Sequence, residues 1–341
     1  MLRGILLATR VFERKEAGYR AVTVAVRDTE GTPEGAARAV SELVKDEGAV
    51  VLLGPLSSGE APAAAAAAQK LRVPIITLTQ REGIIGEGEY VFRSLLTPTD
   101  EARAVAIYAT RRLLISRFAI LHPADPFGRA LATAFAEEIA GRGGRITKRA
   151  SYEGTFDIPE KVGALYERSP EGETAAPWDA IFIPDGVFAA RIAARHLREA
   201  GVRGRKMLGT GLWNTSDALL GDTLVGAVFA AAFSESDARP ASRAFSASYR
   251  RTFEDAPDAL AAQAHDVAAL LVSLMGPGSR NGPRHLRERL EVTSGIDGAA
   301  GTLRFEGGRD AHRGAIILTV RGGRIVPLAS GKPGSARRPA R

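Results

Sequence analysis

Four hydroxyl side chains stand at the ends of two apolar runs and could bind a small ligand. They are Ser57 and Ser58, after residues 49–53, and Thr77 and Thr79, in and just after residues 73–78. Both runs have the composition of buried parallel strands, which is near-continuously apolar. Because parallel strands of an open α/β sheet bind ligands at their carboxyl ends, we expect these hydroxyls to share one edge of a sheet.

The turn between the two runs has the spacing of a helix start. Ser57 and Glu60 fit the capping-box pattern, in which the serine side chain caps a helix and the glutamate reaches back. A helix start offers unpaired N–H groups and a positive dipole end, which suit a carboxylate or another anion. The same pattern is equally consistent with serines that only cap a helix and bind nothing.

Three further places carry side chains that could do chemistry. His122 and Asp125 lie together in HPADPFG and could form an acid–base pair, although Asp125 is also well placed to cap the next helix. Asp185 follows a predicted strand in IFIPDG and either lines a ligand site or caps a helix. Trp213 in GTGLWN either stacks on a ligand or closes the edge of a domain.

Signatures of enzymes and metal sites are missing from the sequence. It has no G-x-S-x-G elbow, no P-loop and no G-x-G-x-x-G after a strand. Cysteine is absent, and the five histidines show no H-x-x-x-H pair, so the pattern predicts no zinc site. We therefore expect a protein without cofactor and without catalytic activity.

Strands alternate with helices of ten to eighteen residues along most of the chain, which predicts βαβ units and parallel sheets. The number of strands predicts an α/β fold with two doubly wound lobes rather than one small sheet. The chain opens in an amphipathic helix with Leu2, Ile5, Leu6, Val11 and Phe12 as its apolar positions, followed by a predicted strand at Val22–Val26. Seams between the lobes are predicted near residues 114–117 and 229–234.

Composition restricts the partners. The 341 residues carry a net charge of +7, and the basic residues are scattered over predicted helices apart from a basic tail at 329–341, which we expect to be disordered. Scattered charge with only 6% aromatic residues argues against nucleic-acid binding. No run approaches the ~18–20 apolar residues of a membrane helix, and the first residues show no signal-peptide pattern.

Several motifs in order resemble the leucine-binding-protein-like periplasmic proteins. They are LLGPLSSGEA, AQKLRVPIITLTQ, YVFRSLLTPTDEARAVAIYA, RFAILHPADPFGRALATAFAEEI, WDAIFIPDG, MLGTGLWN, AAQAHDVAALL and GTLRFEGGRDAHRGAIILTVRGGRIV. The chain is similar in this way from residue 2 to about 328, and the subtype resembles the penicillin-binding-protein activator branch. The fold implied is the type I periplasmic-binding fold, with two Rossmann-like lobes and a ligand cleft between them.

The resemblance implies lobe boundaries and a function. Lobe 1 would hold residues 1–116 and 234–300, and lobe 2 residues 117–233 and 301–328. The function implied is a non-enzymatic periplasmic penicillin-binding-protein activator that acts in cell-wall synthesis through protein contacts, with a penicillin-binding protein as partner. The alternative is the substrate-binding component of an ABC importer, with an ABC permease as partner and an amino acid or a small polar or anionic solute as ligand.

The resemblance also implies a ligand site, from which this chain departs at three positions. The residues that match the family's site are Ser57, Ser58, Thr77, Thr79, Arg81, Phe127, Asp185 and Trp213. The family's acidic partner for an ammonium group is Gly211 here, its tyrosine is Phe127, and a threonine position is Arg81. Loss of an anion and gain of a cation disfavour a zwitterionic amino acid, so we expect an anionic ligand or none.

A fourth departure concerns the first strand. Relatives of this fold begin with an inner strand of lobe 1, whereas this sequence begins in the helix that follows it. Either the true start lies upstream, or the fold has lost that strand and leaves backbone groups beside Val22–Val26 without partners.

Overall fold

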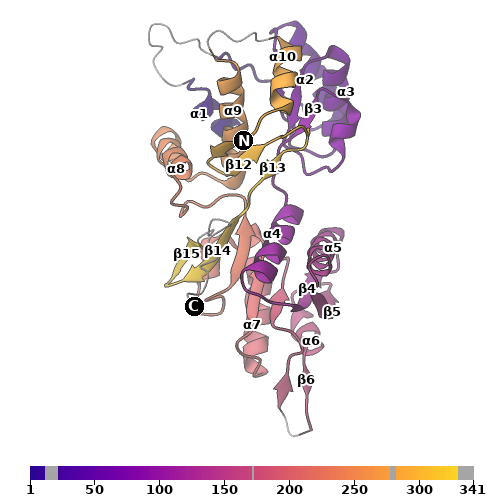
Figure 1. Cartoon of the computed structure of the whole chain (residues 1–341), viewed down its shortest axis with the longest axis vertical. Coiled ribbons are helices and arrows are strands. Elements are labelled where there is room, and N and C mark those ends of the chain that lie inside the picture. Colours follow the sequence, from indigo (N-terminus) through magenta and orange to yellow (C-terminus); the bar gives the residue numbers. More distant parts are fainter. Residues whose placement is uncertain (12–21, 171–172, 277–281, 329–341) are drawn as a thin grey trace, which may run out of the picture. The chain divides into compact units, whose positions relative to one another are not determined.

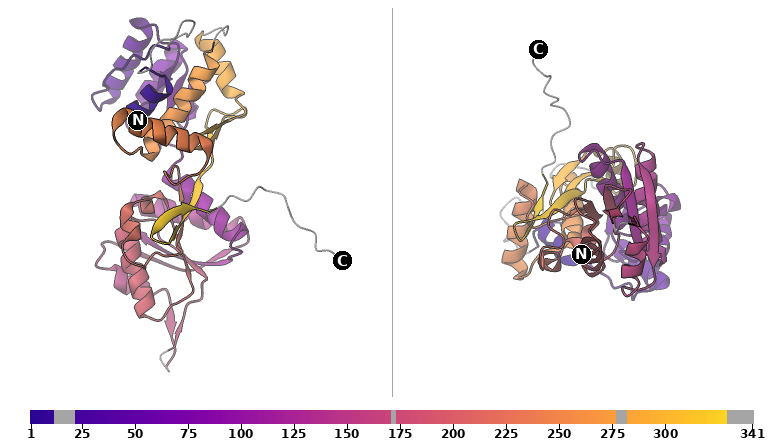
Figure 2. Two further views of the ribbon diagram at one scale, coloured as in Figure 1. Left: turned by 90° about the vertical axis from the view of Figure 1, so that its left-hand side faces the viewer. Right: turned by 90° about the horizontal axis from the view of Figure 1, so that it is seen from below.

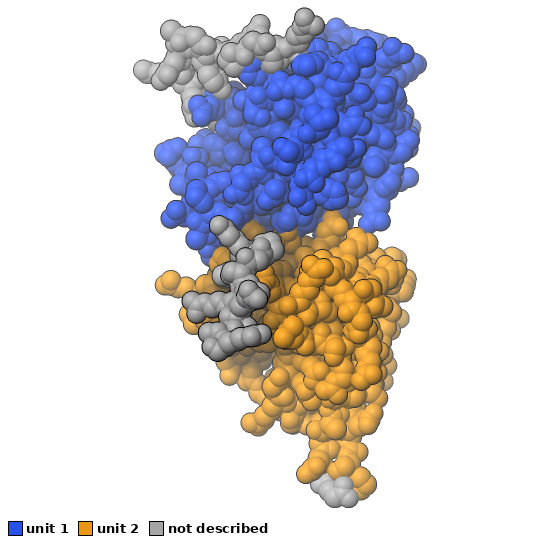
Figure 3. Space-filling model, in the orientation of Figure 1, with its two compact units in different colours: residues 1–97, 232–314 blue, residues 98–231, 315–341 orange. Residues whose placement is uncertain are grey.

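The computed structural model describes residues 1–11, 22–170, 173–276 and 282–328. The chain divides into two compact units, coloured blue and orange in Figure 3. Unit 1 holds Met1–Thr97 and Ala232–Gly314, and unit 2 holds Pro98–Ala231 and Ala315–Arg341. The predicted tail at 329–341 lies outside the described residues, as does Phe12.

Unit 1 is built on a three-stranded parallel sheet with the order β1-β2-β3 (Figure 1). A second, antiparallel sheet has the order β11-β12-β13. The strands are β1 (Leu52–Leu53), β2 (Ile75–Thr77), β3 (Val91–Arg93), β11 (Ile296–Gly298), β12 (Gly301–Arg304) and β13 (His312–Arg313). The helices are α1 (Leu2–Ala8), α2 (Pro33–Lys45), α3 (Ala61–Leu71), the 3₁₀ helix η1 (Ile84–Glu87), α8 (Pro240–Phe253), α9 (Ala259–Leu274) and α10 (Pro283–Glu291).

Unit 2 is built on a seven-stranded sheet with the order β15-β14-β10-β9-β8-β4-β5. The five strands from β10 to β5 are parallel, and β14 and β15 continue the sheet in antiparallel pairing. In Figure 2 these last two strands are the yellow ones beside the pink sheet. The strands are β4 (Arg117–Pro123), β5 (Arg145–Tyr152), β8 (Ala180–Phe182), β9 (Lys206–Gly209), β10 (Val228–Ala231), β14 (Ile316–Arg321) and β15 (Arg324–Pro327).

Among its described residues, unit 2 also contains four α-helices, two short 3₁₀ helices and a small two-stranded ribbon. They are α4 (Pro98–Arg111), α5 (Pro126–Ala140), α6 (Ile158–Gly163), β6 (Glu167–Arg168), β7 (Thr174–Ala175), α7 (Val187–Glu199), η2 (Gly211–Trp213) and η3 (Ser216–Leu219). Alternate residues of the parallel strands enter two cores, one on each face of the sheet. No helix in the described part of the chain is long and apolar enough to cross a membrane.

The boundary between the units differs from the predicted lobe boundary. It lies at Thr97–Pro98 instead of after residue 116, because α4 buries Ala102, Val105 and Ala106 in the same core as Phe118. Residues 301–314, which we expected in lobe 2, belong to unit 1, because β12 pairs with β11 and β13. The repeated alanines of α4 make that close packing of helix on sheet possible.

Two predicted local structures are wrong. Val22–Val26 forms no strand, and it pairs with none in the described part of the chain. The capping box is absent: α3 begins at Ala61, Glu60 already has helical backbone angles, and no side chain caps the helix. Pro62 stands in the first turn and has no N–H to be capped, whereas Ala61 donates its N–H to the carbonyl of Ser57 at 3.1 Å.

Candidate functional site

The carboxyl ends of β1 and β2 bring two of the predicted hydroxyls together in unit 1. Leu52 and Leu53 pair in parallel with Ile75 and Ile76, so both strands end at one edge. The Oγ of Ser58 lies 3.1 Å from the Oγ1 of Thr79. Thr79 is fully buried, whereas Ser58 is exposed, so the pair leads from the sheet to the solvent.

Arg81 adds a positive charge to this edge. Its backbone N–H donates to the Oγ1 of Thr79 at 3.2 Å, and its side chain is exposed. Within the described ranges the Arg81 guanidinium has no ion pair, and the exposed Ser57 hydroxyl has no hydrogen bond. The edge therefore offers an unneutralised cation and hydroxyl donors, a combination that suits a carboxylate.

Thr77 is turned away from this group. Its side chain is fully buried, and its Oγ1 donates to the carbonyl of Phe92 on β3 at 3.0 Å. That bond ties β2 to its neighbour, so in this structure Thr77 stabilises the sheet and presents no free hydroxyl to a ligand.

In unit 2 the predicted side chains lie after the strands around a topological switch point. The first strand, β4, lies between β5 and β8 in the sheet. The chain therefore continues to one side of β4 when it forms β5 and to the other side when it forms β8. Crevices for ligands form at such points, outside the carboxyl ends of the strands. Phe127 follows β4, and Asp185 follows β8.

Asp185 is held by two donors. One carboxylate oxygen accepts the Tyr152 hydroxyl at 2.5 Å, and the other accepts the N–H of Gly186 at 2.6 Å. Burial, followed by the hydrogen bond and the charge of Asp185, raises the pKa of Tyr152 above its usual value, so the phenol stays protonated and donates. Asp185 thus orients the start of α7 without acting as its N-cap, which is Gly186.

Trp213 lies in the core of unit 2 and is fully buried. Its indole N–H donates to the carbonyl of Asp185 at 2.8 Å. A Cβ at Gly209 would lie 2.4 Å from the indole ring, so glycine at the end of β9 makes room for it. Of the two interpretations of this residue, the structure agrees with closure of the domain edge.

Phe127 and Asp125 lie at the start of α5, where the first is exposed and the second caps the helix. The Phe127 side chain is 41% exposed in the first turn of α5. Asp125 caps that helix by accepting the N–H of Gly128 at 2.6 Å, which confirms the capping interpretation over an acid–base pair. Phe127 is therefore available at the edge, while Asp125 is occupied.

His122 takes part in a fixed hydrogen-bond chain. Its Nδ1 lies 2.7 Å from the carbonyl of Pro123, and Arg149 donates from Nε to its Nε2 at 3.1 Å. Nε2 can accept only when the ring is neutral, so the geometry assigns the proton to Nδ1. Burial lowers the pKa of His122, and the nearby charges of Arg149 and Arg129 lower it further.

Sequence reasoning missed Glu101 and Thr210. The buried Glu101 carboxylate accepts the N–H of Gly211 at 2.8 Å, from a position 110 residues away in the chain. Thr210, at the end of β9, is fully buried, and among the described residues its Oγ1 has no hydrogen-bond partner. Thr210 could have been found from the sequence, because it carries a hydroxyl and directly follows a predicted strand. No sequence signal links Glu101 to Gly211.

Comparisons with known proteins agree with this architecture. A family model described as periplasmic binding protein matches residues 1–324. A putative branched-chain amino acid ABC transporter protein from Rhodospirillum rubrum is 22% identical, with a TM-score of 0.82 over 96% of this chain and 94% of that one. No curated protein matches the chain.

Two further similar structures contain ligands. An ABC transporter substrate-binding protein from Desulfitobacterium hafniense in complex with Leu is 20% identical, with a TM-score of 0.71 over 96% of this chain and 95% of that one. A solute-binding protein from Rhodopseudomonas palustris in complex with 3,4-dihydroxybenzoic acid is 21% identical, with a TM-score of 0.69 over 96% and 90%. The chain belongs to the periplasmic binding protein family and has its type I fold.

Proposed function

We propose that this protein is the solute-binding component of an ABC importer and that its ligand is a small carboxylic acid. The observation that carries the proposal is the strand-end group of Ser58, Thr79 and Arg81 in unit 1, where a cation has no partner in the described ranges and stands next to hydroxyl donors. Leucine and 3,4-dihydroxybenzoic acid, the ligands named for two similar structures, share a carboxylate.

An acid without an ammonium group fits the charges better than an amino acid does. Arg81 would repel an ammonium group close to the carboxylate. On the edge of unit 2, Asp185 already accepts from Tyr152 and Gly186. We therefore favour aromatic or other simple monocarboxylates as ligands. The proposal includes a periplasmic location, an ABC permease as partner and no catalysis.

The similar proteins favour this function over a penicillin-binding-protein activator. Those named above are described as ABC transporter or solute-binding proteins. An activator works through protein contacts and does not need a free cation at the strand ends, so the two functions differ in whether a small acid binds.

Calorimetric titration with benzoate, 4-hydroxybenzoate and leucine tests the proposal. We expect saturable binding of a benzoate with weaker or no binding of leucine, and a rise in melting temperature with ligand concentration. Arg81→Gln should weaken binding by about tenfold or more, because a charge-assisted hydrogen bond contributes about 1.5–3 kcal/mol.

Lys70→Gln is the matched control. It removes one exposed positive charge from the last turn of α3, at the opposite end of that helix from Ser57 and Ser58. Its affinity should equal that of the unmodified protein. If no carboxylic acid binds, the importer proposal is wrong; if one binds equally well to both variants, the site is not at Arg81.

A further inference from the structure

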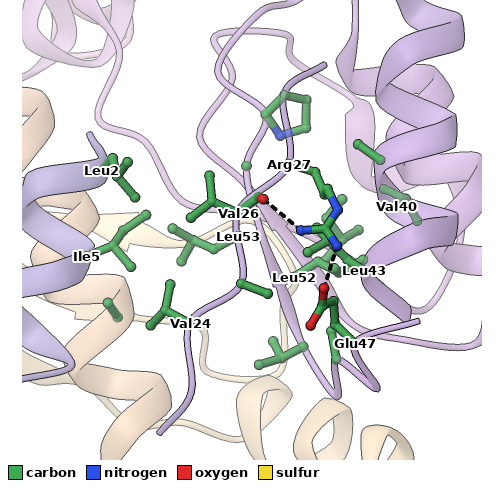
Figure 4. Close-up of a pocket in the computed structure, with 18 of the residues that line it drawn as sticks. Leu2, Ile5, Val24, Val26, Arg27, Val40, Leu43, Glu47, Leu52 and Leu53 are labelled. Carbon is green, nitrogen blue, oxygen red and sulfur yellow. Dashed lines mark hydrogen bonds and ion pairs between the residues drawn. The ribbon is translucent and has the colours of Figure 1, made fainter. Parts of the chain in front are cut away.

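Two cavities, one in each unit, differ in the chemistry of their walls. The cavity in unit 1 has a volume of about 910 Å³ and is largely apolar, and Figure 4 shows Ile5, Val24 and Leu53 in its walls. The cavity in unit 2 has a volume of about 470 Å³, and four basic side chains and one acidic side chain line it. Sites for small molecules have volumes of about 300–1,000 Å³, so this basic cavity has room for a ligand.

The basic cavity lies at the amino-terminal edge of the unit 2 sheet. Its walls include the loops 202–205 and 222–227, which lead into the parallel neighbours β9 and β10. Lys206 joins the two loops, because its Nζ donates to the carbonyl of Gly226 at 3.1 Å. Asp185 follows β8 at the other edge of this sheet, so the cavity is separate from the strand ends described above.

Two of the four cations in the cavity wall are already neutralised by carboxylates. Arg198 pairs with Asp222 at 2.9 Å, and Arg205 pairs with Asp179 at 3.1 Å. Arg203, which is exposed, and Lys206 pair with no carboxylate in the described part of the chain. The cavity therefore keeps two cations without an anionic partner.

The end of α7 does not account for these two cations. A helix C-terminus carries about half a negative charge, which favours basic residues in its last turn. Arg198 already stands in the last turn of α7. Half a charge balances neither Arg203 nor Lys206 in full, so both remain available to an external anion.

The other free polar groups of the cavity wall include several hydrogen-bond donors. The backbone N–H groups of Arg203, Gly204 and Arg205 donate to no other described residue. Consecutive N–H groups in a turn make a concave site for an anion, and Gly204 gives this loop its turn with a φ of 69°. The hydroxyl of Thr223, on the facing loop, also has no hydrogen bond within the described ranges.

We propose that this cavity binds a small molecule through a phosphate monoester group. Such a group carries about 1.5–2 negative charges and three acceptor oxygens, which match two cations and a set of donors. A carboxylate has one charge and would leave Arg203 or Lys206 without a partner. Apolar side chains of Val202 and Leu224 line the same cavity, which is larger than a phosphate group, so the ligand also has an apolar part.

Calorimetric titration of the full chain with butyl phosphate tests the proposal, in about 150 mM NaCl to screen general attraction to a basic surface. We expect saturable binding, with inorganic phosphate about tenfold weaker because it lacks the apolar chain that packs against Val202 and Leu224. Arg203→Gln should weaken binding of butyl phosphate by about tenfold or more, because a charge-assisted hydrogen bond is lost. The exposed Arg203 side chain makes no contact on which folding depends.

Arg111→Gln is the matched control. It removes the charge of another exposed arginine of unit 2, in the last turn of α4, which does not line the cavity. Its affinity for butyl phosphate should equal that of the unmodified protein. Amide resonances of Gly204 and Thr223 should shift as butyl phosphate is added, which places the ligand between the two loops.

Three outcomes would overturn the proposal. Equal affinity of Arg203→Gln and the unmodified protein would mean that the anion does not bind in this cavity. Equal weakening by Arg203→Gln and Arg111→Gln would mean attraction to net charge only. Inorganic phosphate binding as tightly as butyl phosphate would rule out a monoester as the ligand. Arg81→Gln should leave the affinity for butyl phosphate unchanged, so this result is independent of the importer proposal.

Discussion

The carboxylate of Glu101 accepts a 2.8 Å hydrogen bond from the backbone N–H of Gly211. A Cβ at Gly211 would lie 2.8 Å from one Glu101 oxygen and 3.0 Å from the other. The glutamate of α4 therefore occupies the space that a side chain at position 211 would take. That contact joins two residues that are 110 positions apart in the sequence.

Glu101→Ala should destabilise unit 2 by about 1–3 kcal/mol, because the Gly211 N–H loses a charged acceptor and the buried site loses packing. Glu101→Gln keeps the shape and an acceptor oxygen and should cost less. Urea unfolding of the two variants, followed by tryptophan fluorescence, measures the difference. Equal free energies of unfolding for Glu101→Ala and the unmodified protein would show that the contact contributes nothing.

Unit 1 contains a buried ion pair between Arg313 and Asp266, whose side chains are each 1% exposed and lie 3.5 Å apart. Asp266 also accepts the N–H groups of Ala299 and Ala300 at 2.6 and 2.9 Å. Burial lowers the pKa of Arg313 to about 10, and the charge of Asp266 opposes that shift, so the guanidinium is charged at neutral pH.

Arg313→Met should destabilise the protein by about 3–5 kcal/mol, because it leaves the Asp266 charge buried without its partner. Arg284→Met, which removes one member of an exposed pair with Glu288 on α10, is the control and should change little. Denaturant midpoints of the two variants make the comparison. Similar small losses for both would mean that Asp266 is satisfied by the two backbone N–H groups alone.

Elements with a strong local signal could be predicted from the sequence. The alternation of strands and helices indicated parallel α/β sheets, and the structure confirms this fold class. Asp125 was predicted as a cap because an aspartate followed by proline starts helices through local geometry alone. The prediction of a helix cap depends only on residues within one helical turn of the cap.

Features that depend on distant partners could not be predicted. Val22–Val26 has the composition of a strand, but a strand also requires a neighbour to pair with, and the sequence does not show that the neighbouring space is a cavity. The contact of Glu101 with Gly211 joins residues 110 positions apart. The capping box failed because Pro62 lets the helix begin three residues later without a side-chain cap.

His122 provides a pH-dependent contribution to stability. Its pKa is lower in the folded protein than the ordinary 6.5, so the unfolded chain binds the proton more readily. Stability is therefore fully present above about pH 6.5 and falls as the pH decreases from 6.5 through the folded-state pKa. Protonation also removes the acceptor for Arg149, since both ring nitrogens then carry hydrogen.

His122→Asn tests this contribution because asparagine does not titrate. The free energy of unfolding of the unmodified protein should fall more steeply than that of the variant between about pH 6.5 and pH 5. The comparison requires urea curves at several pH values for both proteins. Parallel curves would contradict a lowered pKa at His122.

Tyr152 should remain protonated in strongly alkaline solution. Burial, the hydrogen bond to Asp185 and the Asp185 charge all disfavour the phenolate, so its pKa lies above the ordinary value of about 10. Tyr152→Phe removes this phenol. The difference in ultraviolet absorbance near 295 nm between the unmodified protein and the variant should therefore show no ionisation near pH 10. The variant should also lose about 1–2 kcal/mol of stability, because Asp185 is left with the Gly186 N–H and water. A full tyrosinate signal from Tyr152 at about pH 10 would mean that the phenol is not held against Asp185 in solution.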